Sequence, residues 1–173
     1  MSTQKDEKPL KIIGNNVLVS VAGIDKIPAK VDTGADSSTI WASQIRIKDD
    51  NKLEFTLLGK SHPLYTGEKL STASYSVQRV RSSNGQVSIR YRVVLPMRVK
   101  GKTIRTKFTL SNRSRNRFPI LIGRKTLQNK FLVDVSKVAI SRPATFDNTD
   151  LNAELKANPQ EFYRKYMSYS RSK

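Results

Sequence analysis

The stretch AKVDTGADSS, residues 29–38, decides the fold that this sequence predicts. An apolar run, Ile27–Val31, is typical of a short buried strand and leads directly into Asp32-Thr33-Gly34. A turn after such a strand can present the Asp32 carboxylate to a cleft. The alternative is a turn in which the aspartate side chain hydrogen-bonds its own backbone. The tripeptide alone leaves both interpretations open.

Two segments further along the chain favour the first interpretation. The alternating runs Tyr75–Arg81 and Gln86–Leu95 flank Ser82-Ser83-Asn84-Gly85, and Asn-Gly between two such runs predicts a β-hairpin. Residues 118–124, FPILIGR, contain a short, wholly apolar strand that ends at Gly123. A strand with Asp-Thr-Gly, a long hairpin and a second apolar strand therefore follow one another in order.

The remainder of the chain is also predicted as mainly β-structure, with short strands separated by turns. Residues 59–75 are predicted as a long loop, and residues 111–117 as a basic loop. Residues 124–129 are predicted as one or two helical turns. The other predicted strands are Lys11–Val21 broken at Gly14-Asn15-Asn16, the half-buried Leu53–Leu57, Met97–Val99, Thr103–Leu110 and Phe131–Val135.

These segments resemble the retropepsins, the single-domain aspartic proteases, and more closely a bacterial retropepsin-like family often labelled "ATP-dependent zinc protease". The resemblance rests on AKVDTGADSS, RVRSSNGQVSIRYRV and LSNRSRNRFPILIGRKTLQNKFLVD, which span roughly residues 10–137. It implies a closed β-barrel with a flap hairpin and a short helix after the Ile-Leu-Ile-Gly strand. Position 36 departs from the closer family, because Asp36 stands where its members often carry a basic residue, so substrate preference does not transfer.

Three regions are expected along the chain. Residues 1–9 are predicted as a flexible N-terminus, and residues 10–140 as the retropepsin-like aspartic protease domain. Residues 141–173 are predicted as a partly helical C-terminal extension. Within it, Asn158-Pro159-Gln160-Glu161 has a capping residue, a proline at the first helical position and a glutamate at the third, so helices are predicted over residues 151–157 and 159–169.

Peptide hydrolysis without a metal or a covalent nucleophile needs a base to activate water and an acid to protonate the carbonyl oxygen. Two carboxylates about 3 Å apart that share one proton can do both. The chain contains a single Asp-Thr-Gly, at Asp32. The second carboxylate is therefore expected from a second copy of the chain, in a two-fold homodimer.

Each predicted site residue has an expected role. Asp32 is the predicted catalytic residue. Thr33, Gly34 and Ala35 are expected to support the catalytic loop, with the Thr33 hydroxyl joining the two loops of the dimer. The resemblance implies an ion pair between Asp36 and Arg124, while an exposed loop charge is the alternative for Asp36. Predicted substrate contacts are Gly34, Asp36, Arg81, Asn84 and Gly85, and residues expected to pack beneath the loop are Ile122, Gly123 and Arg124.

Composition excludes several kinds of chemistry. The 173 residues include no cysteine and one histidine, so disulfides, thiol nucleophiles and cysteine zinc sites are excluded. The single histidine, His62, is predicted in a surface loop. No cofactor or metal is expected, and the ATP and zinc of the family label have no support in these residues. No membrane span or signal peptide is visible, so a soluble protein is expected, with the cytoplasm slightly favoured over the periplasm.

The charge predicts an anionic partner. The chain has a formal net charge of +18, and the 16 basic residues from Lys69 to Lys130 are interrupted by no aspartate or glutamate. One hypothesis is an aspartic endopeptidase that acts on a peptide or protein substrate of acidic character, with the flap arginines around it. Which face of the flap Arg79 and Arg81 occupy stays open. The alternative is a non-catalytic module whose basic surface binds RNA, the ribosome or an acidic protein.

Overall fold

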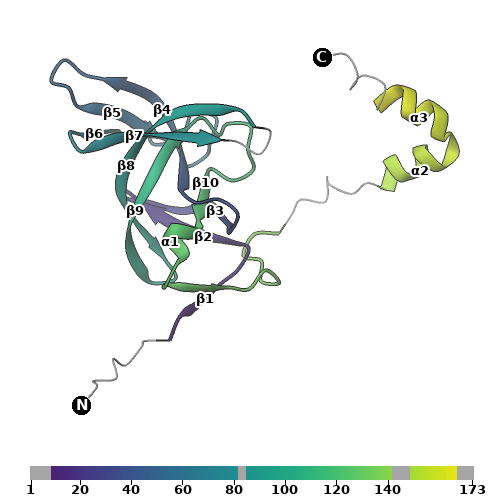
Figure 1. Cartoon of the computed structure of the whole chain (residues 1–173), viewed down its shortest axis with the longest axis horizontal. Coiled ribbons are helices and arrows are strands. Elements are labelled where there is room, and N and C mark those ends of the chain that lie inside the picture. Colours follow the sequence, from purple (N-terminus) through teal and green to yellow (C-terminus); the bar gives the residue numbers. More distant parts are fainter. Residues whose placement is uncertain (1–8, 82–84, 142–148, 167–173) are drawn as a thin grey trace. The chain divides into compact units, whose positions relative to one another are not determined.

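The computed structural model describes residues 9–81, 85–141 and 149–166. The chain divides into two compact units, Met1–Ile140 and Ser141–Lys173. Figure 1 shows the strands of the first unit and the two helices of the second. We describe each unit by itself.

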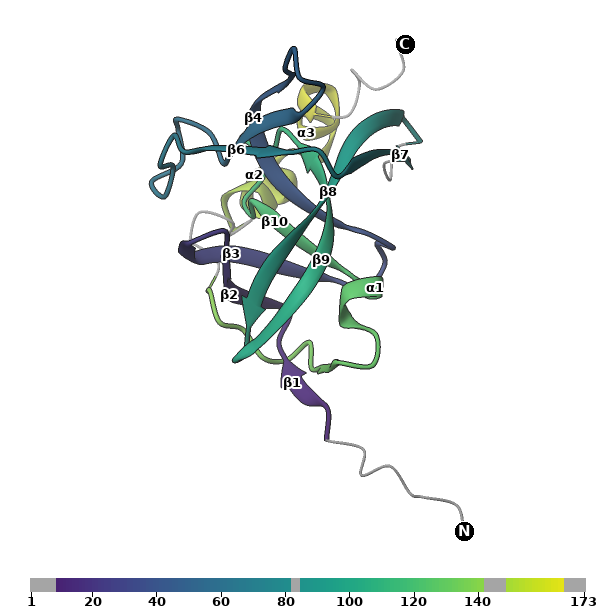
Figure 2. The same cartoon turned by 90° about the vertical axis from the view of Figure 1, so that its left-hand side faces the viewer.

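The first unit is a closed β-barrel. Its strands are hydrogen-bonded in the order β10-β3-β2-β8-β9-β4, and β4 closes the ring by pairing with β10. Figure 2 shows β2, β3, β8 and β9 on one side of this barrel. The barrel strands are β2 (Asn16–Val21), β3 (Ile24–Asp32), β4 (Ser38–Ile47), β8 (Val87–Val99), β9 (Lys102–Ser111) and β10 (Ile120–Gly123).

Further strands extend this barrel. β5 (Leu53–Leu57) and β6 (Lys69–Thr72) continue the sheet beyond β4. β7 (Tyr75–Arg81) pairs with the first half of β8 and forms the predicted hairpin, which we call the flap. β1 (Lys11–Ile13) and β11 (Phe131–Val133) form a separate parallel two-stranded sheet, and the short helix α1 (Arg124–Leu127) follows β10. The retropepsin-like, mainly β fold is therefore confirmed.

β10 joins the two motifs that lie about ninety residues apart in the sequence. It runs parallel to β3, with Ile122 opposite Val31 and Gly123 opposite Asp32. On its other side it pairs in antiparallel fashion with β4. Ile120 and Ile122 are almost completely buried, because a strand enclosed by two others faces the core. This enclosure explains the wholly apolar sequence of the strand.

Three local predictions were wrong. β5 is buried on both faces rather than half-buried, and the Glu54 carboxylate is held there by Arg46 at 2.7 Å. β6 lies inside the predicted loop 59–75. β8 runs unbroken through Pro96. One edge of β8 pairs with β7 as far as Val93 and with β2 from Met97 onward, so residues 94–96 have no partner strand along this edge. The missing N–H of Pro96 therefore removes no ladder hydrogen bond there.

The second unit contains α2 (Thr149–Ala157) and α3 (Pro159–Tyr166). Asn158 Oδ1 accepts a hydrogen bond from the Glu161 backbone N–H at 3.1 Å, and Asn158 Nδ2 donates to Glu161 Oε2 at 3.1 Å. This reciprocal pair satisfies a free N–H of the first helical turn and so explains where α3 begins. The end predicted for this helix, at 169, lies outside the described residues. No described helix is long and apolar enough to cross a membrane.

Candidate active site

Asp32 is the last residue of β3 and is half-buried. Its carboxylate Oδ1 accepts a hydrogen bond from the Gly34 N–H at 3.2 Å, and its carbonyl accepts one from the Ala35 N–H at 3.3 Å. The first bond also matches the simple turn that the tripeptide alone left open. The surroundings of the carboxylate therefore decide its role.

A hydrogen-bonded support lies directly beneath this loop. The Arg124 N–H donates to the Ala35 carbonyl at 2.8 Å, which joins the loop to the start of α1. The Gly123 N–H donates to Ser38 Oγ at 3.0 Å, and Ser38 Oγ shares a hydrogen bond of 2.8 Å with Thr126 Oγ1. Ser38 and Thr126 are buried, so these bonds are shielded from water.

Gly123 is required here by close packing. A Cβ at this position would lie 2.6 Å from the Ser37 carbonyl carbon and oxygen and 2.9 Å from the Ala35 oxygen. All three atoms belong to the backbone and cannot rotate away. The glycine therefore allows β10 to lie against the catalytic loop.

Asp36 interacts with two cationic side chains at the start of α1. Its carboxylate forms an ion pair with Arg124, as the resemblance implies, and lies 3.9 Å from Lys125 Nζ. All three side chains are more than half exposed, so the pair orients the loop more than it stabilises the fold.

Thr33 and Gly34 lie at the exposed outer side of the loop. The Thr33 hydroxyl bonds to no described residue of its own chain. The hydrogen bonds predicted for this hydroxyl would join two copies of the loop, so this role stays a prediction.

The flap is attached to the catalytic loop by Gln78. Its Nε2 donates to Ser37 Oγ at 2.9 Å. Arg90 is the cross-strand partner of Gln78, so both side chains lie on one face of the hairpin. The alternation of β-strands places Arg79 and Arg81 on the other face, together with Val77 and Ile89, which are 59% and 70% exposed.

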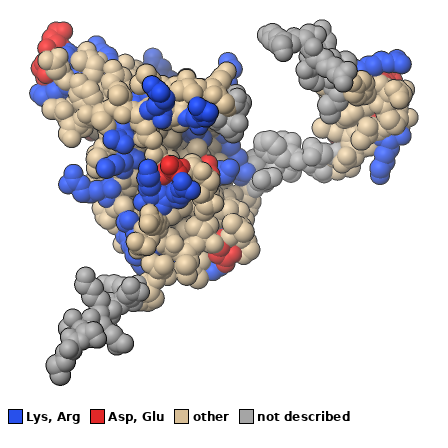
Figure 3. Space-filling view, viewed as in Figure 1, with Lys and Arg blue, Asp and Glu red and all other residues tan. Residues whose placement is uncertain are grey.

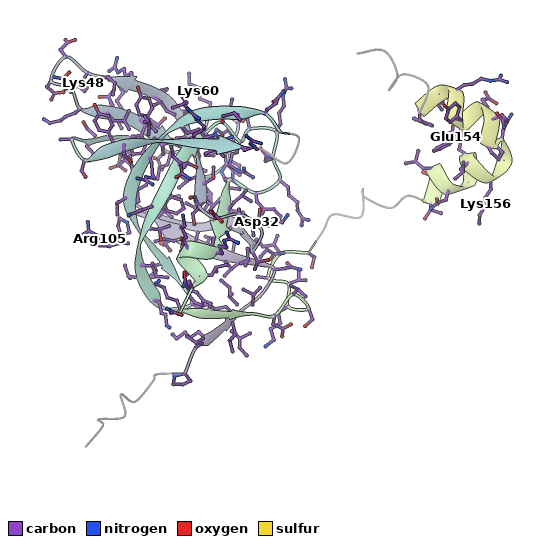
Figure 4. All side chains as sticks on the ribbon, viewed as in Figure 1. Asp32, Lys48, Lys60, Arg105, Glu154 and Lys156 are labelled. Atoms are coloured by element: carbon purple, nitrogen blue, oxygen red, sulfur yellow. The ribbon has the colours of Figure 1, made fainter. Side chains whose placement is uncertain are left out.

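A cleft of about 810 Å³ lies between the flap and the catalytic loop. In Figure 4 the labelled Asp32 lies near the middle of the barrel. Figure 3, in the same view, shows acidic atoms in this region surrounded by lysine and arginine side chains. Of the predicted site residues, those that border the cleft are Asp32, Gly34, Ala35, Asp36 and Arg81. Gly85 follows the flap tip with a φ of +83°, and Asn84 lies outside the described residues.

Arg113 is one of several cleft residues that the sequence did not assign to the site. It lies between β9 and β10, and it borders the cleft. Burial lowers the pKa of its guanidinium, the charge of Arg90 lowers it further, and the Asp32 carboxylate raises it. The neighbouring Arg115 and Arg117 are exposed, whereas Arg113 is half-buried. In the sequence these three arginines look alike, so no local signal separates them.

His62 is partly buried rather than freely exposed. Its ring contacts Trp41 edge-on, with the ring centroids 5.8 Å apart, and burial lowers its pKa. It does not border the cleft. Within the described part of the chain, no group of three or more histidine, aspartate or glutamate side chains could hold a metal ion.

A closed barrel, a glycine-supported Asp-Thr-Gly loop and a hairpin above the aspartate define a retropepsin-like protein. The comparison with protein families agrees with this class. The chain belongs to the RimB-like family, described as "retropepsin-like aspartic endopeptidase RimB", whose model matches residues 12–144.

Curated relatives carry a different name. The chain is 34% identical over 122 residues to a "probable alpha-L-glutamate ligase" of Shewanella halifaxensis, and this match covers 66% of the chain and 26% of the relative. A ligase of the same name from Desulfotalea psychrophila is 27% identical over 154 residues, which cover 80% of the chain and 33% of the relative. The chain thus spans about a quarter to a third of these relatives.

A solved structure has a similar fold. The crystal structure of a Legionella pneumophila protein of unknown function has a TM-score of 0.57 and 25% sequence identity. The match covers 74% of this chain and 95% of that protein. The matched region therefore makes up nearly the whole of that solved protein, which has a similar fold.

Proposed function

We propose that the protein is an aspartic endopeptidase whose active form is a homodimer with Asp32 of each copy facing the other. The observation that carries this proposal is the placement of Asp32. Its carboxylate lies half-buried at the end of β3, under a hairpin attached to the same loop, in a cleft of about 810 Å³. A cleft of this size accommodates several residues of an extended peptide.

The two carboxylates divide the chemistry between them. The ionised Asp32 removes a proton from a water molecule, whose oxygen then attacks the carbonyl carbon of the peptide bond. The protonated Asp32 of the second copy donates its proton to the carbonyl oxygen as the tetrahedral intermediate forms. The first Asp32, which now carries the proton from water, donates it to the amide nitrogen, and the C–N bond breaks as a hydroxyl proton of the intermediate returns to the second Asp32.

The requirement for a second copy follows from the carboxylates of the cleft. Among the described residues that border it, Asp36 is the other acid. Its carboxylate is paired with Arg124 and lies near Lys125, so these contacts leave it unavailable to share a proton with Asp32. The exposed Thr33 hydroxyl and Gly34, next to Asp32, leave this side of the loop open to a second copy.

An acidic peptide is the substrate that the surroundings of Asp32 favour. Arg90 and Arg113 border the cleft, and no described carboxylate forms an ion pair with either. The relatives named alpha-L-glutamate ligase contain the matched region as about a quarter to a third of their length. Because proteins named for glutamate contain the same region, their similarity supports a glutamate-rich substrate for this chain.

The test is the cleavage of a peptide library by the wild type and by Asp32→Asn. The variant keeps the shape of the side chain and loses the base, so we expect cleavage to fall by at least about a thousandfold with an unchanged thermal unfolding curve. The matched control is Asp25→Asn, which removes an exposed carboxylate at 3.7 Å from Arg98 and should cleave normally.

A chelator provides the second arm of this test. Because we assign the acid and base roles to carboxylates, cleavage should be unchanged in excess chelator. A loss of activity that zinc restores, or an active Asp32→Asn variant, would overturn the proposal.

One observation favours a second function, a module that binds a polyanion. The outer face of β8 and β9 exposes Arg98 and Lys107, and the turn between the two strands exposes Lys100. RNA that binds this face would be held through its phosphates, so its affinity should fall steeply with salt. RNA binding by a protein that cleaves no peptide of the library would favour this function over the endopeptidase.

A further inference from the structure

Arg90 and Arg113 approach the same part of the cleft from two different elements. Arg90 comes from the flap strand β8, on the face that carries Gln78. Arg113 comes from the segment between β9 and β10, which follows the strand that pairs with β8. Both border the cleft that contains Asp32, and both are half-buried.

Each guanidinium is anchored through its Nε atom. Arg113 Nε donates to the Phe118 carbonyl at 3.0 Å, and a turn closed by the Asn116 N–H and the Arg113 carbonyl holds its backbone. Arg90 Nε donates to Ser88 Oγ at 3.1 Å. Within the described residues, the terminal Nη amino groups of these two arginines donate no hydrogen bond. These groups are the ones that a guanidinium offers to a carboxylate in a two-pronged contact.

The two cations lack an anionic partner of their own. No carboxylate of the described residues forms an ion pair with either, although exposed arginines nearby, such as Arg124, do have one. Burial and the nearby charge of Arg90 both lower the pKa of Arg113, so the approach of the two cations is unfavourable. Asp32 is the carboxylate that offsets this repulsion, and in the proposed mechanism it must remain available to water. An anionic group from the substrate would relieve the repulsion without engaging Asp32.

We propose that Arg90 and Arg113 form a subsite that binds the side-chain carboxylate of a substrate residue beside the scissile peptide bond. This inference rests on the proposed peptidase function and assigns its acidic specificity to two residues. Arg79 and Arg81 also border the cleft, but their side chains start from the opposite face of the flap and are exposed, so they act mainly through the general field around it. Recognition of the carboxylate then depends on two contacts, and the +18 charge of the whole chain is not sufficient for it.

The test compares two peptides and three single variants. One peptide contains glutamates around the cleaved bond, and the other has glutamine at the same positions. The variants Arg90→Gln and Arg113→Gln each remove one cation of the subsite. Arg105→Gln is the matched control, because it removes an equal charge from the exposed outer face of β9, which Figure 4 labels away from Asp32.

Loss of one charged hydrogen-bonding partner should lower kcat/KM for the glutamate peptide by roughly tenfold or more. The glutamine peptide should change by less than about twofold, and Arg105→Gln should leave both within about twofold of the wild type. The double variant should lose less than the product of the two single losses, because both arginines hold one carboxylate. Equal losses on both peptides, or an equal loss in Arg105→Gln, would overturn the subsite.

A binding measurement separates this inference from the proposed function. In the Asp32→Asn background, fluorescence anisotropy of the labelled glutamate peptide gives a dissociation constant without cleavage. Absence of cleavage by the wild type would reject the peptidase, while a tenfold weaker binding in Arg113→Gln but not in Arg105→Gln would still support the subsite. Arg113 also donates a hydrogen bond to the Phe118 carbonyl, so its replacement could destabilise the fold. The thermal unfolding of each variant is therefore compared, and Arg90→Gln tests the subsite if Arg113→Gln is unstable.

Discussion

Gly123 shows how one residue couples the fold to the site. It ends β10 opposite Asp32, donates its N–H to Ser38 and lies against the backbone of residues 35 and 37. Its φ of −80° is open to any residue, so the requirement for glycine is one of space. The Ile-Leu-Ile-Gly sequence therefore ends in glycine because two backbone segments meet there.

Replacing Gly123 by alanine should destabilise the protein by about 1–3 kcal/mol, because the added methyl group meets backbone atoms that cannot turn aside. Chemical denaturation followed by tryptophan fluorescence measures this free energy. Gly34→Ala is the matched control, because a Cβ at position 34 would meet only Asp32 Oδ1, at an ordinary 3.5 Å. An equal loss of stability in both variants would contradict this account of Gly123.

At the scale of elements, the flap and the catalytic loop are joined through side chains. Gln78 reaches Ser37 from the middle of β7, while the hairpin is otherwise held to the barrel through the pairing of β8 with β9 and β2. A hairpin that extends from its sheet opens locally more easily than the barrel does. The Gln78–Ser37 contact therefore restrains the flap above Asp32.

Gln78→Ala should increase flap opening. Loss of one hydrogen bond, about 0.5–1.5 kcal/mol, corresponds to roughly two- to tenfold faster exchange of the β7 amide hydrogens, with no change in the barrel core. Hydrogen–deuterium exchange with mass spectrometry measures both. Ser37→Ala should reproduce the effect, and the double variant should add nothing further. Unchanged exchange in β7 would show that the contact does not restrain the flap.

At the scale of the whole molecule, the proposed mechanism depends on assembly. One chain contributes a single catalytic carboxylate, and the side chain next to it, Thr33, is exposed with no bond to a described residue. A symmetric interface would place this hydroxyl against the same loop of a second copy. Stability of the site and association of the chains would then be linked.

Sedimentation at concentrations on the order of tens of micromolar should give a particle of twice the 19.6 kDa chain mass. Thr33→Val should shift the equilibrium toward the monomer and lower specific activity at low enzyme concentration. Thr103→Val, a change at an exposed threonine of β9, is the control and should leave the association unchanged. A fully active monomer would contradict the dimer.

Local signals in the sequence were sufficient for most of the framework. The hairpin of β7 and β8, the apolar strand that ends in glycine and the capping residue Asn158 were each predicted from residues within a few positions of one another. These signals predicted the hairpin and the place of Asp32 at a strand end, and the resemblance that their order supports predicted the closed barrel and the role of the hairpin as a flap. The ion pair of Asp36 with Arg124 followed from the resemblance.

Only the tertiary structure decided which side chains meet in the cleft. The facing of Arg79 and Arg90 depends on the register of β7 against β8 and on where Gln78 contacts the loop. The selection of Arg113 from a run of similar arginines depends on how residues 111–118 fold back against the barrel. Alternation and turn chemistry act over a few residues, whereas burial and the pairing of charges depend on contacts between segments far apart in sequence, and these arise only once the barrel has closed.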